Sequence, residues 1–172
     1  MIQKFWKTVV ASLVGVIIAT AGANATKLGK AEGAVLLTVT GAVTQANFGD
    51  AVQFDLAMLE AFDSTVIETT TNWTKGVQRF RGVSLAVLID ALGIRSGTLR
   101  AAAINDYTVE IPVTDAVKGG PIVAFELNGK PMSRRNKGPL WIIYPYDSNE
   151  AYKSELIYTR SIWQLDRIEA VH

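Results

Sequence analysis

Residues 79–93 read RFRGVSLAVLIDALG and contain the clearest helix signal in the chain. Ser84 is a favourable residue at the start of a helix, because its hydroxyl can accept a hydrogen bond from the free amides of the first turn. Gly93 readily adopts the left-handed conformation in which helices commonly end. The stretch therefore predicts a helix over residues 85–92.

Before this helix, the sequence predicts two strands and one more short helix. The strands are predicted over residues 35–39 and 65–71, which are rich in β-branched side chains. The helix is predicted over residues 56–62, because Asp55 can cap it and its apolar side chains share one face.

After the helix at 85–92, the pattern changes to strands and tight turns. Strands are predicted over residues 101–104, 107–111, 122–127, 140–144 and 162–171. Asn128-Gly129 favours positive φ at both positions and predicts a hairpin between residues 125–127 and 130–132. Two short helices among six or seven strands predict an α+β domain with a mostly antiparallel or mixed sheet.

Composition excludes several classes of function. The chain has 172 residues, 17 Lys and Arg against 16 Asp and Glu, one histidine and no cysteine. Its longest basic run is the pair Arg134 and Arg135, so it lacks the concentrated positive face that nucleic-acid binding requires. The lack of cysteine excludes disulfides, thiolate nucleophiles and metal sites with protein sulfur.

The first 25 residues have the pattern of a signal peptide. Lys4 and Lys7 precede an apolar run over residues 9–21, and Ala23-Asn24-Ala25 is a small-x-small site of the kind that signal peptidase cleaves. The alternative is an uncleaved anchor, but the run is shorter than the roughly 20 residues that a membrane helix needs. We expect a signal peptide over 1–25, a single domain over 26–172 without a transmembrane span, and a periplasmic or secreted mature protein.

Five stretches, beginning with the one already quoted, follow one another in a characteristic order. They are RFRGVSLAVLIDALG (79–93), AINDY (103–107) with IPVTD (111–115), LNGKPM (127–132) and GPLW (138–141). Together they resemble the sulfite-oxidase-type molybdopterin-binding domain, a family that includes sulfite oxidases and periplasmic reductases that repair methionine sulfoxide. The resemblance covers about residues 35 to 171. It implies a strand-rich α+β fold, an oxidoreductase family and a molybdopterin cofactor.

One feature of the resembling family is missing. Its catalytic members bind molybdenum through a cysteine on the strand before the Gly-Val-x-Leu helix. The corresponding residues 66–73 read VIETTTNW, which places Thr69 or Thr70 at this position. A neutral hydroxyl does not replace a thiolate ligand at neutral pH. We therefore do not expect independent molybdenum catalysis.

The resemblance also implies a phosphate site near the last strand, in an Arg-Ser-Val-Lys-Trp type of motif. Residues 159–164 read TRSIWQ, so Arg160 and Ser161 match the motif, while Trp163 stands in about the place of the lysine. A guanidinium and a hydroxyl both suit an anion; the alternative is an exposed turn.

Further candidate cofactor-binding residues come from two loops. Arg134 and Lys137, with Arg135 between them, either rim a cleft and attract an anion or form a solvated loop. Asn72 and Trp73 either face the same cleft or form an ordinary turn.

Two hypotheses of function remain open. In the first, a metal survives on the cofactor's own sulfurs and a partner supplies electrons. In the second, the fold is a non-catalytic module. It either senses a small anionic or pterin-like ligand or interacts with a membrane or periplasmic protein.

Tyr144, Tyr146 and Tyr152 either form an apolar surface for such a partner or pack a loop. Asn105, Asp106 and Tyr107 form a polar wall or a turn.

Overall fold

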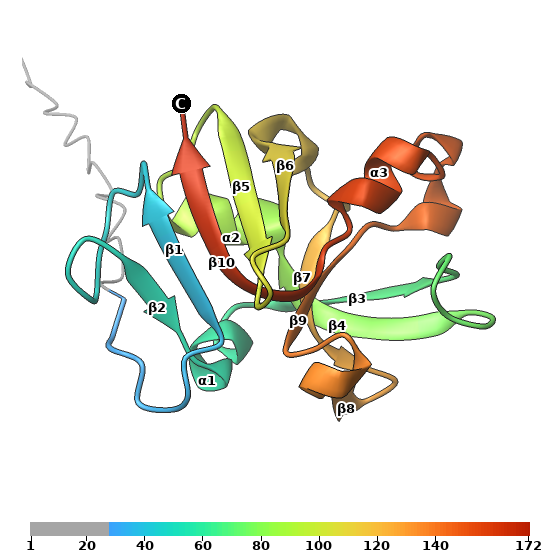
Figure 1. Ribbon diagram of the computed structural model, residues 1–172, viewed down its shortest axis with the longest axis horizontal. Coiled ribbons are helices and arrows are strands. Elements are labelled where there is room, and N and C mark those ends of the chain that lie inside the picture. Colours follow the sequence, from blue (N-terminus) through green and yellow to red (C-terminus); the bar gives the residue numbers. More distant parts are fainter. Residues whose placement is uncertain (1–27) are drawn as a thin grey trace, which may run out of the picture.

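The computed structural model describes residues 28–172, so the predicted signal peptide over residues 1–25 lies outside the described part. The described chain forms a curled ten-stranded sheet with three short α-helices (Figure 1). The β1–β10 pair is parallel and the other strand pairs are antiparallel. The predicted α+β class with a mixed sheet is confirmed.

The elements have the following bounds. The strands are β1 Leu37–Gly41, β2 Val52–Phe54, β3 Ser64–Thr69, β4 Gln78–Ser84, β5 Thr98–Ala103, β6 Thr108–Pro112, β7 Ile122–Leu127, β8 Lys130–Pro131, β9 Leu140–Ile143 and β10 Trp163–Val171. The α-helices are α1 Leu56–Glu60, α2 Leu85–Ala91 and α3 Glu155–Arg160. Short 3-10 turns cover η1 Val113–Asp115, η2 Arg134–Asn136, η3 Tyr146–Ser148 and η4 Glu150–Tyr152.

β10 connects the two halves of the sheet. The strand order is β2-β1-β10-β9-β7-β4-β3, and β5 with β6 attaches to the other side of β10. The start of β10 pairs with β9, while its later residues lie between β1 and β5 (Figure 1). The register shifts between Trp163 and Leu165, and Gln164 between them has φ +53°. This irregular start of β10 is where the candidate site lies.

The predicted cap of the first helix is confirmed and that of the second is wrong. The Asp55 carboxylate accepts a hydrogen bond from Met58 N at 2.9 Å at the start of α1. Ser84 does precede α2, but its side chain makes no capping hydrogen bond. The chain enters α2 directly from β4, and Leu85 N donates to the Pro121 carbonyl at 2.9 Å instead.

Two predicted turns are confirmed by their backbone angles. Gly93, after α2, has φ +71°, and a Cβ there would lie 2.3 Å from Thr44 Oγ1. Asn128 and Gly129 have φ of +52° and +75° between β7 and β8.

The helix α3 and the strands β2 and β4 were not predicted. Ser154 caps α3 by accepting a hydrogen bond from Ile157 N at 3.4 Å. Arg160 is the last residue of this helix, so the turn expected at Arg160 and Ser161 is a helix end.

No helix within residues 28–172 has the length and apolar character needed to cross a membrane.

The core is formed mainly by hydrophobic side chains of the strands and of α2. Its largest fully buried side chains are Trp141, Tyr144, Tyr146, Phe54, Phe80 and Phe125. Tyr144 and Tyr146 are therefore core residues, and of the two interpretations of the tyrosine cluster the structure supports packing. Burial raises the pKa of both phenols above the usual range.

Candidate functional site

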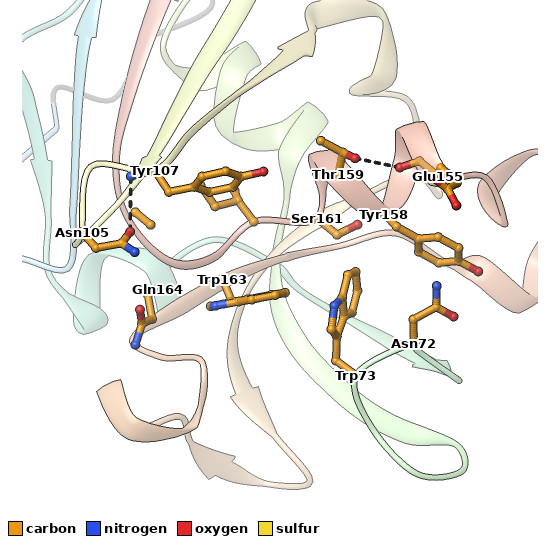
Figure 2. Close-up of a pocket in the computed structure, with 12 residues that line it drawn as sticks. Asn72, Trp73, Asn105, Tyr107, Glu155, Tyr158, Thr159, Ser161, Trp163 and Gln164 are labelled. Carbon is orange, nitrogen blue, oxygen red and sulfur yellow. Dashed lines mark hydrogen bonds between the residues drawn. The ribbon is translucent and has the colours of Figure 1, made fainter.

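A pocket of about 480 Å³ lies at the start of β10, where the β5–β6 turn, α3 and the loop after β3 meet (Figure 2). Its lining residues are Asn72, Trp73, Ala103, Asn105, Tyr107, Glu155, Tyr158, Thr159, Ser161, Ile162, Trp163 and Gln164. These residues come from three segments that are far apart in sequence: 72–73, 103–107 and 155–164. The pocket therefore exists only in the folded chain.

Aromatic rings make up much of the pocket wall. The Trp73 ring centroid lies 5.4 Å from that of Trp163 and 5.8 Å from that of Tyr158, with both pairs in edge-to-face geometry. Trp73 is backed by the buried Trp141 at 5.7 Å. Trp163 and Tyr107 remain 36% and 54% exposed. Rigid, partly exposed rings of this kind offer faces on which a flat ligand can stack.

Polar groups are interspersed among the rings. The side chains of the lining residues make two hydrogen bonds among themselves: Asn105 Oδ1 accepts from Tyr107 N, and Thr159 Oγ1 donates to the Glu155 carbonyl (Figure 2). Gln164 Nε2 donates to the Arg134 carbonyl at 2.6 Å. The side-chain oxygen of Gln164 takes no part in this bond. The carboxamide of Asn72 and the remaining groups of Asn105 and Gln164 can therefore bind the edge of a ligand.

The structure brings three of the six predicted cofactor-binding residues to the pocket wall. Asn72, Trp73 and Ser161 line it. Ser161 is 1% exposed, and its hydroxyl accepts from Tyr146 Oη at 2.6 Å and donates to the Ile157 carbonyl at 2.7 Å. Its hydroxyl is thus used within the protein.

Arg160 lies apart from the lining residues, although it is adjacent to Ser161 in sequence. Its guanidinium forms an ion pair with Asp115 at 2.9 Å, and the same carboxylate oxygen accepts from Tyr144 Oη at 2.8 Å. Neighbouring residues at a helix end point in different directions, which is why the structure separates the two side chains.

Lys137 and Arg134 lie on the loop before β9 and are not among the lining residues of the pocket. The Lys137 ammonium lies 4.0 Å from the Trp163 ring centroid and 5.3 Å from that of Trp141. Burial lowers the pKa of Lys137 below its usual range. Arg134 contributes its carbonyl to Gln164, and its side chain is exposed.

Sequence reasoning did not select Tyr158, Thr159 or Glu155, because α3 itself was not predicted. The apolar run Leu156-Ile157-Tyr158 is too short to indicate a helix, although Ser154 is a recognisable cap. Tyr107 and Asn105 do line the pocket, so the interpretation of a polar wall is supported for these two residues. Asp106, with φ +65°, forms the turn.

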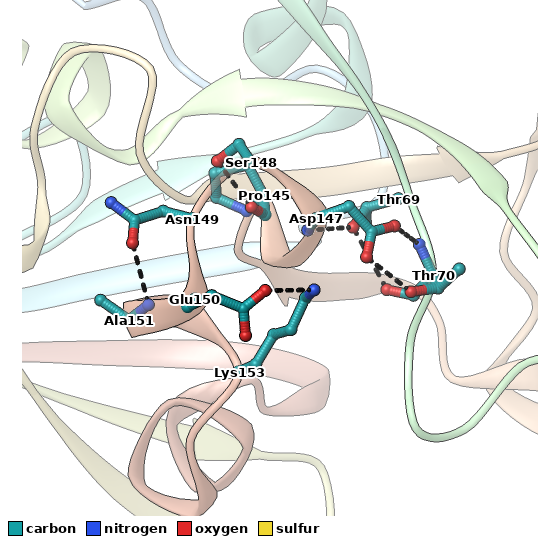
Figure 3. Close-up of polar contacts among 9 residues, drawn as sticks. All are labelled: Thr69, Thr70, Pro145, Asp147, Ser148, Asn149, Glu150, Ala151 and Lys153. Atoms are coloured by element: carbon teal, nitrogen blue, oxygen red, sulfur yellow. Dashed lines mark hydrogen bonds and ion pairs between the residues drawn. The ribbon is translucent and has the colours of Figure 1, made fainter.

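The two threonines expected at the position of the missing cysteine join β3 to the loop after β9 (Figure 3). Thr69 is buried, and its hydroxyl donates to the Thr70 carbonyl at 3.2 Å and accepts from Asp147 N at 3.1 Å. Thr70 N and Oγ1 donate to the Asp147 carboxylate at 2.6 and 2.8 Å. These bonds, led by that from Thr70 N, lower the pKa of Asp147. Neither threonine is among the lining residues.

Comparison with known proteins agrees with the fold. Residues 35–150, which are more than half of the chain, match the family model of the oxidoreductase molybdopterin binding domain. The chain belongs to this family. The match ends before α3 and β10, so the residues of the pocket from Glu155 onward lie outside it.

Among solved structures, the sulfane dehydrogenase SoxCD from Paracoccus pantotrophus has the same fold, with a TM-score of 0.57 and 19% identity. The similarity covers 78% of this chain and 37% of that one, so the chain spans little more than a third of that relative. No match was found among curated proteins.

The side chains present do not fit a molybdenum centre held by protein ligands. The chain has no cysteine, and the hydroxyl of Thr69 is already hydrogen bonded within the fold. Within residues 28–172, no three acidic or histidine side chains gather where they could hold a metal ion. The aromatic and amide lining fits a flat organic ring, which is the part of the family's cofactor that needs no metal ligand.

Proposed function

We propose that this chain is an exported, ligand-binding member of its family, which binds a pterin-like ring in the aromatic pocket and does not perform molybdenum redox catalysis on its own. The observation that carries the proposal is the pocket lining, where exposed aromatic faces lie next to carboxamides. A pterin is flat and has several donors and acceptors at its edge. Stacking on Trp163 or Tyr107 and hydrogen bonds to Asn72, Asn105 or Gln164 would satisfy both properties.

A protein-interaction module is the second candidate. It is favoured by two exposed hydrophobic side chains that line the pocket, Tyr107 in the β5–β6 turn and Trp163 at the start of β10. Exposed apolar side chains that lie close together are typical of interaction surfaces. This function requires no small molecule in the pocket.

The first test is native mass spectrometry with elemental analysis of the mature protein, purified from a periplasm in cells that make molybdopterin. The proposal expects a bound pterin-like mass, with molybdenum far below one atom per chain. Near-stoichiometric molybdenum would overturn the proposal that the chain lacks its own redox centre.

The second test is a titration with 6-hydroxymethylpterin, followed by tryptophan fluorescence. We expect one binding site per chain and a loss of affinity of about tenfold or more for Trp163→Ala, because the substitution removes a stacking face. Phe48→Ala is the matched control, since Phe48 is exposed and outside the pocket lining. Lack of binding by the unmodified chain would favour the protein-interaction candidate.

A further inference from the structure

We propose that the aromatic rings behind the pocket form a one-electron transfer chain, which carries an oxidising equivalent from Trp163 in the pocket wall to Tyr144 in the core. The oxidant is a one-electron oxidant strong enough to oxidise an indole, such as an oxygen-centred radical that reaches the pocket. The chain removes the oxidising equivalent from the ligand site and holds it in the interior. This activity goes beyond the proposed function, because it does not depend on which ligand the pocket binds.

The oxidisable rings form one connected cluster. It contains all three tryptophans of residues 28–172 and four of the five tyrosines of the chain. Each member has its ring centroid within 6.5 Å of that of another member: Trp73, Trp141, Trp163, Tyr144, Tyr146, Tyr152 and Tyr158. Indoles and phenols are the aromatic side chains that lose one electron most readily. Rings in contact pass such an electron vacancy, or hole, from one to the next.

Trp73 joins the tryptophans of the cluster to its tyrosines. Its ring centroid lies 5.4 Å from that of Trp163 and 5.8 Å from that of Tyr158 (Figure 2). The centroid of Tyr146 lies 6.5 Å away. Among the aromatic pairs of residues 28–172, no other pair links a tryptophan to a tyrosine. A hole that starts on Trp163 therefore reaches the tyrosines through Trp73.

Tyr144 is the end of the chain because it has a base. Tyr146 leads to it, with ring centroids 5.3 Å from Tyr158 and 6.5 Å from Tyr144. Tyr144 is fully buried, and its phenol donates to the Asp115 carboxylate at 2.8 Å, whereas the phenol of Tyr146 donates to the Ser161 hydroxyl, a much weaker base. Burial raises the pKa of Tyr144, so the resting side chain is a neutral phenol. An oxidised phenol is a strong acid and gives its proton to the acceptor that it already contacts.

The charges around the rings favour movement of the hole away from the pocket. The Lys137 ammonium lies 4.0 Å from the Trp163 ring centroid and 5.3 Å from that of Trp141. An oxidised indole is a cation, so a neighbouring ammonium raises its energy. Tyr144 becomes neutral once its proton has moved to Asp115. The hole is therefore more stable on Tyr144 than on either of these tryptophans.

The electrons and protons of the reaction balance. Trp163 gives one electron to the oxidant, which is reduced by one electron. Each ring along the chain then replaces the electron that its neighbour has lost, until Tyr144 is the ring that lacks one. The phenolic proton of Tyr144 moves to the Asp115 carboxylate. The products are the reduced oxidant, a neutral tyrosyl radical, a protonated carboxyl group and intact tryptophans.

The test makes use of a chain without cysteine. Asn105→Cys supplies a single attachment site in the pocket wall for a ruthenium polypyridyl photosensitiser. Tyr107→Phe is combined with it, because Tyr107 is 54% exposed beside the label and outside the cluster. A laser flash in the presence of a cobalt(III) electron acceptor oxidises the label, and time-resolved absorption and electron paramagnetic resonance identify the radicals. We expect a tryptophan radical followed by a neutral tyrosyl radical, and slower formation of the tyrosyl radical in D2O.

Three further substitutions in this labelled chain locate the hole. Trp73→Phe should abolish the tyrosyl signal and keep the tryptophan signal, because a phenyl ring is not oxidised under these conditions. Tyr144→Phe should abolish the tyrosyl signal as well. Tyr152→Phe is the matched control and should leave the signal unchanged, since the Tyr152 ring lies 5.8 Å beyond Tyr144 at the far end of the cluster.

A tyrosyl signal that survives Trp73→Phe or Tyr144→Phe would overturn the proposed chain. So would a labelled parent chain that forms only tryptophan radicals, or one whose tyrosyl radical appears with no tryptophan radical before it. The order of the two radicals in the parent chain tests the proposal even if a variant does not fold.

Discussion

The hydroxyl of Thr69 ties the end of β3 to the loop after β9. It occupies one of the two positions at which the family resemblance places a metal-binding cysteine, and it is buried and hydrogen bonded. Thr70, the other of the two positions, is hydrogen bonded to the Asp147 carboxylate, so both positions make structural contacts here.

Thr69→Val should lower the free energy of unfolding by about 1–2 kcal/mol, because the substitution keeps the shape and leaves Asp147 N without its acceptor. Urea denaturation measures the change. Thr65→Val, on the same strand and only partly buried, is the control and should have a smaller effect. Equal effects of the two substitutions would contradict the role of the hydrogen bond.

The stability of the same junction should depend on pH. Because hydrogen bonds from Thr70 lower the folded-state pKa of Asp147 below its ordinary value of 3.8, the ionised carboxylate stabilises the fold above that value, and this contribution is lost as the pH falls through the folded-state pKa. The difference in stability between the unmodified chain and Asp147→Asn should therefore shrink between about pH 5 and pH 2. A difference that is constant over this range would show that the carboxylate charge is not involved.

At the scale of elements, the connection from α2 to β5 requires glycine for two separate reasons. Gly93 has a positive φ, and a Cβ there would also collide with the Thr44 side chain. The positive φ follows from its place at the helix end, which the sequence predicted. The collision comes from a residue 49 positions earlier in the chain, and only the fold brings it close.

Gly93→Ala should destabilise the protein by about 2–3 kcal/mol, since it combines backbone strain with a steric clash. Gly119→Ala separates the two effects, because Gly119 has φ +72° with open space around it. That variant should lose only about 1 kcal/mol. Thermal unfolding of both variants gives the comparison, and similar losses would mean that the Thr44 contact relaxes without cost.

α3 is one of the three elements that the sequence did not predict, together with β2 and β4, and it is the one that contributes residues to the pocket. Six residues are too few for apolar periodicity to distinguish a helix from a turn, and packing rather than propensity stabilises so short a helix. Glu155, Tyr158 and Thr159 reach the pocket only because this helix exists.

At the scale of the whole molecule, a buried ion pair joins η1 to the end of α3 across 45 positions of sequence. Asp115 binds both Arg160 and Tyr144, and the two charged side chains are 16% and 17% exposed. Arg160 Nε is buried without a hydrogen-bond partner within the described chain. The pair therefore depends on its single carboxylate.

Asp115→Asn should reduce the free energy of unfolding by about 2–3 kcal/mol, because it leaves the mostly buried guanidinium without a counter-charge. Glu150→Gln breaks the exposed pair with Lys153 and should cost less than about 1 kcal/mol. Chemical denaturation of both variants distinguishes the cases. A loss below about 1 kcal/mol for Asp115→Asn would show that water reaches Arg160 in the folded protein.

The sequence by itself determined the α+β class, the positions of most strands, the Asn128-Gly129 hairpin and the lack of any thiol ligand, because these follow from local backbone preferences and residue chemistry. The tertiary structure decided which charged side chains form ion pairs. Arg160 matches the expected anion motif but is neutralised by Asp115, whereas Lys137 forms no ion pair within residues 28–172 and lies against the Trp163 ring. Charge pairing depends on distances between residues remote in sequence, and only folding sets those distances.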